Sequence, residues 1–475
     1  MPTVLARSAA LPIRPLLPHA HDHSDALPPR RLKHPASSSA PSQSPFAAGP
    51  RAPHYATAAD DLDERPPKRS MPTPKATIAV VNSSGRQAAS FIRVASAVGY
   101  HVRAQLRNLD GIVATEISSL ENVTVLVGDL YTRPKPTGRA SPASAPTDTQ
   151  VNHELIKELF HGAQIAFINT TFWGDEIAIG KALADAAVAA DVQHYIYSSM
   201  PNHSLHDPSW PSLPLWSAKY EVETYIRSLP ALATRSTFLY TGIYNNNFTS
   251  LLYPLFCMEL QPDGSFLWQA PFHPDVKLPW LDAEHDVGPA VLQLVKDGIK
   301  KWAGQRIALA YEMLSPKEAC EVFSRGVGRP VTYRRGGIEV RVKIPNGYRE
   351  QLLALEEMYE LGATDPAKQP PYFGTASFEA SCPEEALALW EGYRGLEEYA
   401  REVFPLEEAA NGLTWMNPPA EEIDDTPDET EDAGEEEDEA DDENEHEHEE
   451  DEEGEDDALA TGVETPARRE EGWLA

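Results

Sequence analysis

Cysteine is scarce in this chain. Its 475 residues include three cysteines, Cys257, Cys320 and Cys382, which stand about sixty residues apart. No pair has the spacing of a CxxC zinc or redox motif, and such distant cysteines do not form a disulfide framework. Both kinds of chemistry are therefore excluded, and a reducing compartment fits the composition best.

Long apolar runs and, towards the end, basic residues are also missing. Pro, Asp or Gly interrupts every apolar stretch before it reaches the roughly 18 residues of a membrane-spanning helix. From Glu421 to Ala475 there are 29 acidic residues and two arginines, so this segment holds most of the formal net charge of −34. We predict a disordered acidic tail over 417–475, suited to solubility or to contact with basic partners. No membrane association is expected, and no direct nucleic-acid binding, which requires a basic face.

The first 75 residues are rich in proline instead. They hold 15 of the 42 prolines and clusters such as SSSAPSQSP, which predicts a disordered Pro-rich arm over 1–75. The basic clusters PPRRLK and PPKRS can serve nuclear import or be scattered charge in that arm, so nucleus and cytoplasm are both expected. Met71 stands where a compact protein would begin, and it is an alternative start to Met1.

From Ala76 to about 416 the pattern becomes that of a folded domain. Short β-branched runs alternate with helical periods, which indicates βαβ units and a parallel sheet. We predict an α/β fold, a Rossmann-type doubly wound parallel sheet over 76–247, with a polar surface insertion at 132–150. The predicted strands are 77–81, 101–106, 122–128, 164–171, 193–199 and 236–244.

After Asn247 the rhythm changes to aromatic and proline-rich loops. We predict a smaller C-terminal lobe over 248–416, which closes over the strand ends. Within it we expect a strand in GQRIALA, helices around 347–360 and 384–403, and a helix near Val287 capped by Asp286.

The stretch VVNSSGRQAAS follows the first predicted strand. Asn82, Gly85 and Ala88 occupy the three positions of a GxxGxxG phosphate-binding turn. Asparagine tolerates left-handed backbone angles, so Asn82 can replace the first glycine. Ser84, Arg86 and Gln87 lie in the same loop, where side chains can donate to phosphate or ribose. The position of the loop predicts binding of NAD or NADP at the start of a helix.

Polar residues recur where the next strands end. An acid after the second strand would favour NAD and an arginine NADP, but the strand ends in Arg107, Asn108 and Leu109, so both cofactors remain open. The ends of the third and fourth strands add further candidate cofactor ligands: Gly128, Asp129, Asn169, Thr170 and Thr171.

Several segments carry a specific resemblance. They include TIAVVNSSGRQAASFIRVASAVGYHVRAQ, HYIYSSMPNHS, GIYNNNFTSLLYPLF, LPWLDAEHDVGPA and LWEGYRGLEEYAREVFP. These segments resemble the NmrA-like family, an atypical branch of the short-chain dehydrogenase superfamily, over about 76–416 apart from 132–150 and 361–382. The resemblance implies a dinucleotide-binding regulator without oxidoreductase activity, which restrains a GATA-type zinc-finger activator of nitrogen genes and favours oxidised dinucleotides. It also assigns Tyr244, Asn245, Asn246 and Asn247 to the cofactor pocket; from the residues alone these could equally form a turn.

The catalytic pair of active short-chain dehydrogenases is incomplete. These enzymes use YxxxK, in which the lysine holds the nicotinamide ribose and the tyrosine transfers the proton. Lys219 is present, but Leu215 stands four residues before it and cannot transfer a proton. Ser198 or Ser199 can match the polarising serine, yet lacks its acid. Lys219 is interpreted as a retained cofactor ligand, with a solvated helix residue as the alternative.

Three functions follow from this pattern. The preferred one is a co-regulator that uses the dinucleotide fold as a binding module, with no catalytic or metal-binding residue. The alternative is an NAD(P)H-dependent reductase that uses Lys219 itself as the base. A third hypothesis is a redox sensor, whose partner affinity differs between the oxidised and reduced cofactor.

Overall fold

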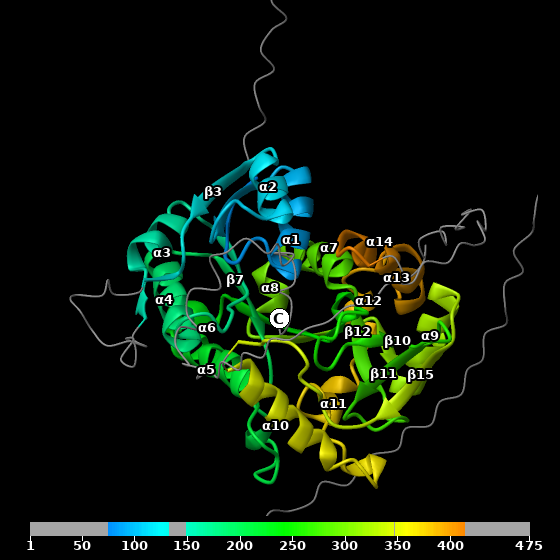
Figure 1. Cartoon of the computed structure of the whole chain (residues 1–475). Coiled ribbons are helices and arrows are strands. Elements are labelled where there is room, and N and C mark those ends of the chain that lie inside the picture. The colour runs from blue at the N-terminus through cyan, green and yellow to red at the C-terminus, as the bar shows by residue number, and fades with distance from the viewer. Residues whose placement is uncertain (1–74, 133–148, 346, 414–475) are drawn as a thin grey trace, which may run out of the picture. The chain divides into compact units, whose positions relative to one another are not determined.

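One parallel sheet organises the part of the chain that the computed structural model describes, residues 75–132, 149–345 and 347–413. Within these residues seven strands lie in the order β13-β8-β7-β6-β1-β2-β3 (Figure 1). They are β1 (Thr77–Val80), β2 (His101–Leu106), β3 (Val123–Val127), β6 (Ile165–Ile168), β7 (His194–Ser199), β8 (Ser236–Thr241) and β13 (Arg306–Leu309). The predicted acidic tail, the predicted arm up to residue 74 and residues 133–148 of the predicted insertion lie outside the described residues.

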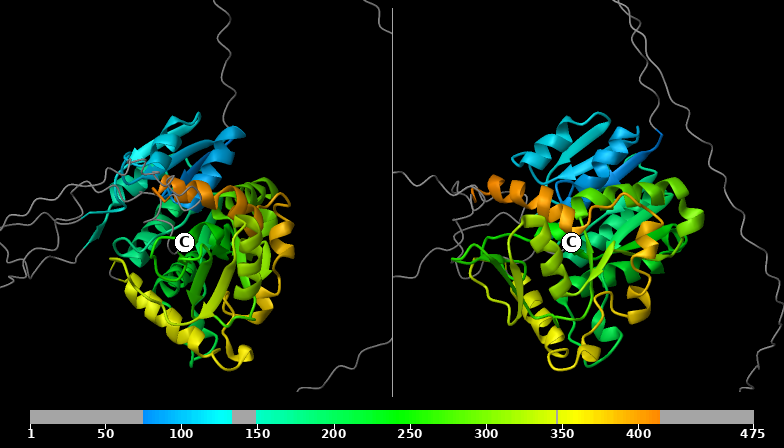
Figure 2. Two further views of the ribbon diagram at one scale, coloured as in Figure 1. Left: turned by 45° about the vertical axis from the view of Figure 1, so that its right-hand side comes forward. Right: turned by 90° about the vertical axis from the view of Figure 1, so that its right-hand side faces the viewer.

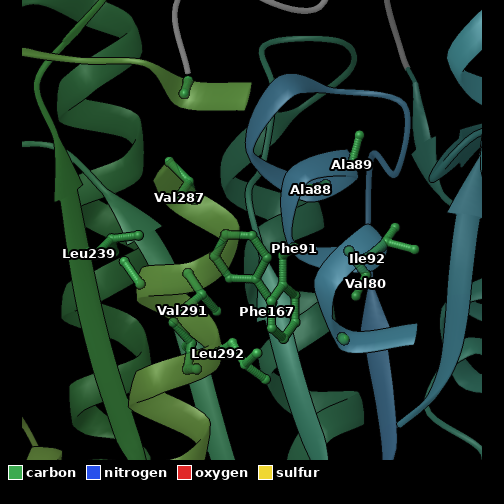
Figure 3. Close-up of a cluster of buried hydrophobic side chains, with 14 of the residues drawn as sticks. Val80, Ala88, Ala89, Phe91, Ile92, Phe167, Leu239, Val287, Val291 and Leu292 are labelled. Carbon is green, nitrogen blue, oxygen red and sulfur yellow. The ribbon is translucent and has the colours of Figure 1, made fainter. Parts of the chain in front are cut away.

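Both faces of the sheet are covered, which explains why central strands such as β7 and β8 are buried along their whole length. Side chains alternate along a strand, so Ile78 and Val80 enter one hydrophobic cluster while Ala79 and Val81 enter another. Figure 3 shows the first of these clusters. Its Phe91 packs edge-on against Phe167, with ring centroids 5.3 Å apart.

Helices of the two faces come from different parts of the chain. The first face carries α1 (Arg86–Ala97), α2 (Ile112–Ser119), α7 (Ala283–Asp297) and α12 (Glu384–Leu387). The second face carries α3 (His153–Leu159), α4 (Glu176–Ala189), α5 (Pro214–Ser228) and α6 (Pro230–Ala233). No helix among the described residues is both long and apolar enough to cross a membrane.

Helices α1 and α7 pack unusually closely. A Cβ atom added to Gly288 of α7 would lie 2.3 Å from the carbonyl oxygen of Ser90 in α1. The Gly288 amide instead donates to Ser90 Oγ at 2.9 Å. Glycine at this position lets a helix from the second half of the chain seat directly on the first helix of the sheet.

The strand order reverses between β1 and β6. The chain runs outward from β1 through β2 to β3 and then returns to pair β6 with the other side of β1. In doubly wound sheets this switch point is where ligands bind, at the carboxyl ends of the strands. The Rossmann-type α/β prediction is therefore confirmed.

The sheet has one strand more than the six predicted. The GQRIALA strand, expected in the smaller lobe, is β13 and pairs in parallel with β8. The predicted strand 236–244 also divides, because the chain leaves the sheet after β8. Gly242 lies against the carbonyl of Pro279, and β9 (Ile243–Tyr244) then pairs with β12 (Leu278–Leu281). Such pairings between distant segments leave no local sequence signal.

The smaller lobe is built on two three-stranded sheets, one of which includes β9. An aromatic core joins them, in which Phe248 stacks on Trp280 at 5.5 Å and Trp268 meets Trp280 edge-on at 5.8 Å. Their strands are β10 (Met258–Leu260), β11 (Phe266–Ala270), β12, β14 (Glu312–Leu314) and β15 (Val331–Arg335). The other described elements are β4 (Tyr131–Thr132), β5 (Gln150–Val151), α8 (Ile299–Trp302), α9 (Pro316–Val327), α10 (Tyr348–Glu360), α11 (Ala376–Glu379), α13 (Leu396–Glu402) and α14 (Phe404–Ala410).

Two helix predictions in this lobe need correction. The expected helix 384–403 breaks into α12 and α13, because Gly392 and Gly395 interrupt it and Gly395 becomes the N-cap of α13. The predicted cap Asp286 is also wrong. Helix α7 begins one turn earlier, where the Asp282 carboxylate accepts from the amides of Glu284 and His285, at 3.1 and 3.0 Å.

Candidate dinucleotide-binding site

The turn after β1 has the shape that the sequence predicted. Asn82 adopts a left-handed backbone with φ of 49°. Its Nδ2 donates to the carbonyl of Asn169 at 2.8 Å, and its own amide donates to Oε1 of Gln105 at 2.8 Å. These bonds tie the turn to the ends of β6 and β2, so Asn82 replaces a glycine without loss of the turn.

Gly85 ends this turn and is the N-cap of α1. Its φ of −68° is open to any residue, so backbone freedom is not what requires glycine there. The remaining reason is the bare backbone, which lets a ligand approach the first amides of the helix. Ala88 is 2% exposed and sits in the core, as expected for the third position. Ser84 is half-buried on the same loop.

Arg86 and Gln87 direct their donors away from the loop in this structure. Arg86 Nη1 lies 2.5 Å from Oε1 of Glu284 and 3.4 Å from Oε1 of Glu407. Burial disfavours the Arg86 charge, but the two carboxylates outweigh it and raise the pKa of the guanidinium. Gln87 donates to the hydroxyl of Tyr244. Their expected bonds to phosphate or ribose stay predictions.

A pocket opens at the carboxyl ends of β1, β2, β3 and β6. It encloses about 300 Å³ that opens to solvent, and it brings together five predicted residues, Asn82, Arg107, Asp129, Thr170 and Thr171. Gly128 lies beside it, since its carbonyl accepts from Gln105 Nε2 at 2.7 Å. Asn108 and Leu109 are exposed and do not line the pocket.

Lys219 is buried in an ion pair. Its Nζ donates to the carbonyl of Thr170 and lies 2.9 Å from Oε1 of Glu176, with the two side chains 3% and 6% exposed. The same carboxylate oxygen accepts from Thr170 Oγ1 at 2.7 Å, and Thr170 Oγ1 lies 2.9 Å from the hydroxyl of Tyr197. The alternative of a solvated helix residue is therefore wrong.

Leu215 occupies the tyrosine position of the superfamily pattern, one turn before Lys219 on α5. Its side chain packs against the hydrophobic core of the lobe. Its amide donates to Oε1 of Gln351 at 3.0 Å. The backbone of Leu215 thus joins α5 to α10. Ser198 and Ser199 are both buried at the end of β7.

The segment Tyr244 to Asn247 is positioned inside the molecule. Burial raises the pKa of Tyr244 to about 12, so its hydroxyl is a neutral hydrogen-bonding group. The side chain of Asn246 has a structural role. Its Oδ1 accepts from the amide of Ala283 at 2.8 Å and so holds the start of α7. Asn247 lines a second, apolar pocket of about 40 Å³, together with Tyr244, Trp216 and Tyr372.

Some of the buried polar atoms without a hydrogen-bond partner lie at these strand ends. They include Oδ1 of Asn169, Oε1 of Gln87, and both amide atoms of Asn245. A buried polar group without a partner costs about 1 to 3 kcal/mol. Unsatisfied amides next to a preformed phosphate-type turn fit a polar ligand such as NAD or NADP, whose ribose and carboxamide groups can satisfy them.

Sequence reasoning missed three residues of this region. Gln105 bridges Asn82 and Gly128, Trp173 holds its ring 5.5 Å from the guanidinium of Arg107, and Glu176 pairs with Lys219. Gln105 carried no distinct signal, because it continues the alternation of polar His101 and Arg103 with apolar residues along β2. Glu176 and Trp173 carried no sequence signal. Their partners, Lys219 and Arg107, lie 43 and 66 residues away in the chain.

Comparison with known proteins agrees with this fold. A family model described as the NmrA-like family matches residues 74–400, which is well over half of the chain. The chain therefore belongs to the NmrA-like family, as its sequence resemblance indicated.

The most informative relatives are fungal regulators. The nitrogen metabolite repression protein nmr of Neurospora crassa is 67% identical over 368 residues, which cover 75% of this chain and 74% of the relative. The nitrogen metabolite repression protein nmrA of Emericella nidulans is 51% identical over 380 residues, which cover 73% of this chain and all of the relative.

Solved structures of NmrA, a negative transcriptional regulator, are similar to this chain as well. One in complex with NAD shares 54% identity and a TM-score of 0.64, and the match covers 72% of this chain and 99% of that one. Another, in complex with NADP, has a TM-score of 0.63 and the same coverage.

Proposed function

We propose that this protein is a dinucleotide-binding negative regulator of transcription in nitrogen metabolite repression. It acts by binding a GATA-type zinc-finger activator and has no oxidoreductase activity. The relatives named for nitrogen metabolite repression, and the NmrA complexes with NAD and NADP, support the role and the choice of ligand.

One observation carries the non-catalytic part of the proposal. Leu215 packs into the lobe at the position of the catalytic tyrosine, while the loop at Asn82 keeps its binding shape. An NAD or NADP molecule supplies a hydride acceptor or donor wherever it binds, but hydride transfer to a carbonyl also needs a proton donor or acceptor. The chain keeps the ligand site and has an apolar side chain in place of that group.

Different residues at the strand ends would contact different parts of the dinucleotide. Backbone amides from Ser84 to Gln87 would hold the pyrophosphate at the start of α1. Arg107 and Asp129 would face the adenosine end. Asn169, Thr170, Lys219 and the segment from Tyr244 to Asn247 would face the nicotinamide end. Because Arg107 and Asp129 share one pocket, both NAD and NADP are accommodated.

The reductase alternative is weakened by the ion pair of Lys219. A general base needs an amine that can reach the substrate, whereas Lys219 Nζ already donates to the carbonyl of Thr170 and lies 2.9 Å from Oε1 of Glu176. Lys219→Ala separates the two hypotheses. Under either hypothesis the variant loses the stability of the buried pair, but a regulator otherwise loses cofactor affinity, while a reductase loses turnover.

The central test is calorimetry on the full chain with NAD, NADP, NADH and NADPH, repeated with the zinc finger of a GATA-type activator. We expect binding of both oxidised dinucleotides, binding of the zinc finger, and no NAD(P)H turnover with carbonyl or isoflavone-like substrates. Robust turnover would overturn the regulator proposal. Equal zinc-finger affinity with oxidised and reduced cofactor would eliminate the redox-sensor version of it.

Localisation to nucleus and cytoplasm is proposed from the basic clusters PPRRLK and PPKRS. Replacing both clusters by alanines in a fluorescently tagged full chain should shift the protein towards the cytoplasm. An unchanged distribution would remove these clusters as import signals.

A further inference from the structure

The phosphate-loop arginine joins the two ends of the folded chain. Arg86, the first residue of α1, is 8% exposed and reaches two carboxylates that come from later helices. Glu284 belongs to the first turn of α7, and Glu407 belongs to α14. Figure 1 and both views of Figure 2 place the orange C-terminal helices beside the blue segment that holds α1.

Helix α14 is held by two neighbouring glutamates with different partners. Glu407 contacts Arg86, and its Oε2 also accepts from the hydroxyl of Tyr399 at 2.9 Å. Glu408 is 1% exposed and accepts from Thr249 Oγ1 at 2.9 Å and from the amide of Ser250 at 3.0 Å. One glutamate therefore fastens α14 to the candidate dinucleotide loop, and the other fastens it to the lobe.

A bound pyrophosphate and the carboxylates of Glu284 and Glu407 would compete for the guanidinium of Arg86. The start of α1 attracts anions through its free amides and helix dipole, and a pyrophosphate at this position carries two negative charges. Glu284 and Glu407 already place two carboxylates around one guanidinium. An incoming pyrophosphate is repelled by these carboxylates and attracts the guanidinium that they share.

We propose that Arg86 couples dinucleotide binding to the attachment of α14, with Glu407 as the competing anion. Binding of NAD draws Arg86 towards the pyrophosphate and loosens the contact with Glu407, while Glu408 keeps the helix on the lobe. Because coupling is reciprocal, anything that detaches Glu407 must tighten dinucleotide binding. The proposal rests on dinucleotide binding as proposed above and adds a route by which the ligand reaches the C-terminal helices.

The test compares Glu407→Gln with two matched controls in the full chain. Tyr399→Phe removes the hydrogen bond from Tyr399 to Glu407 and leaves the Arg86 pair in place. Glu402→Gln removes a neighbouring charge, which is exposed and paired with Arg401. For each variant, calorimetry measures the NAD dissociation constant, and amide hydrogen exchange of residues 404–410 is compared with and without NAD.

The expected results have a definite sign. Glu407→Gln should tighten NAD binding about fivefold or more, in the usual range of coupled sites, with little change in either control. NAD should accelerate exchange in α14 of the unsubstituted protein and leave that of Glu407→Gln unchanged. Melting temperatures are measured as well. If Glu407 has a purely structural role, Glu407→Gln should lower the melting temperature without increasing the affinity for NAD.

Two failures can be told apart. The coupling is refuted if the unsubstituted protein and Glu407→Gln bind NAD with the same affinity and NAD does not change the amide hydrogen exchange of α14. The proposed function then still stands. If the unsubstituted protein binds neither NAD nor NADP, the dinucleotide role is refuted and the coupling with it.

Discussion

Two parts of the candidate dinucleotide site, the loop after β1 (the loop end) and the surroundings of Lys219 (the lysine end), are built from different kinds of contact. At the loop end, a left-handed asparagine and the amides of α1 form a turn held by hydrogen bonds to Gln105 and Asn169. At the lysine end, an ammonium and a carboxylate are buried against each other, with Leu215 packed one turn away. The loop end is held by hydrogen bonds of backbone groups and neutral side chains, whereas the lysine end is held by a buried ion pair.

The largest effect should come from breaking the buried pair at the lysine end. Lys219→Met leaves the Glu176 carboxylate buried without its cation, which should lower the free energy of unfolding by about 3 kcal/mol. Urea unfolding of the full chain measures the change. The double variant Lys219→Met/Glu176→Gln should recover most of the lost free energy of unfolding, because no unpaired buried charge remains. If the losses of the two single variants add instead, the unpaired carboxylate is not the cause.

A slightly smaller effect is expected at the loop end, on affinity and not on folding. Gly85→Leu should weaken NAD binding about 100-fold, or about 2.7 kcal/mol, because its side chain would stand between the ligand and the amides of α1. The φ of −68° accepts leucine, so the melting temperature should change little. Calorimetry measures the affinity, with Gly85→Ala as a milder step. An unchanged affinity for Gly85→Leu would remove the loop from the binding site.

The shape of the turn itself can be tested at Asn82. Asn82→Ala should cost about 1 kcal/mol of stability, because alanine resists the left-handed φ of 49°. Asn82→Gly also loses the bond to Asn169 but fits the backbone, so it should unfold closer to the unsubstituted protein. If both variants unfold alike, the hydrogen bond and not the backbone angle decides the role of Asn82.

The smallest effect concerns pH at the start of α7, beside the loop end. The hydrogen bond to Asp286 raises the pKa of His285 from its ordinary value of 6.5. A raised pKa means that protonation stabilises the folded state, so the contribution is complete below pH 6.5 and is lost as the pH rises above it. His285 is about a third exposed, and solvent screening limits the effect to a few tenths of a kcal/mol. The stability difference between the protein and His285→Gln should shrink from pH 6 to about pH 8; a constant difference would assign His285 a packing role.

The sequence was a good guide where a few neighbouring residues decide the structure. The strand, turn and helix around Asn82 lie within twenty residues, so periodicity and backbone preference together predicted the turn and its left-handed residue. The leucine at position 215, four residues before Lys219, was equally readable, since the YxxxK spacing is local to one helix. Alternation of apolar runs with helical periods was enough for the parallel sheet.

Partners from distant segments were beyond such reasoning. Arg86 was expected to face phosphate, yet its guanidinium meets carboxylates 198 and 321 residues later in the chain. The seventh strand and the Glu176 partner of Lys219 depend on similar long-range contacts. A local pattern shows which residues are available at a strand end, and only the tertiary structure shows which of them other side chains already engage.

The close packing of α7 on α1 sets the order in which the site can be completed during synthesis. Helix α1 emerges early from the ribosome, but Gly288 and the apolar face of α7 that covers it follow about two hundred residues later. Until then the first helix and its loop have one face open to solvent, and the seventh strand is missing from the sheet edge. A fragment that stops at residue 247 would carry the whole binding motif yet lack the support that shapes it. Dinucleotide binding would therefore require that the chain has been made and folded at least through α7.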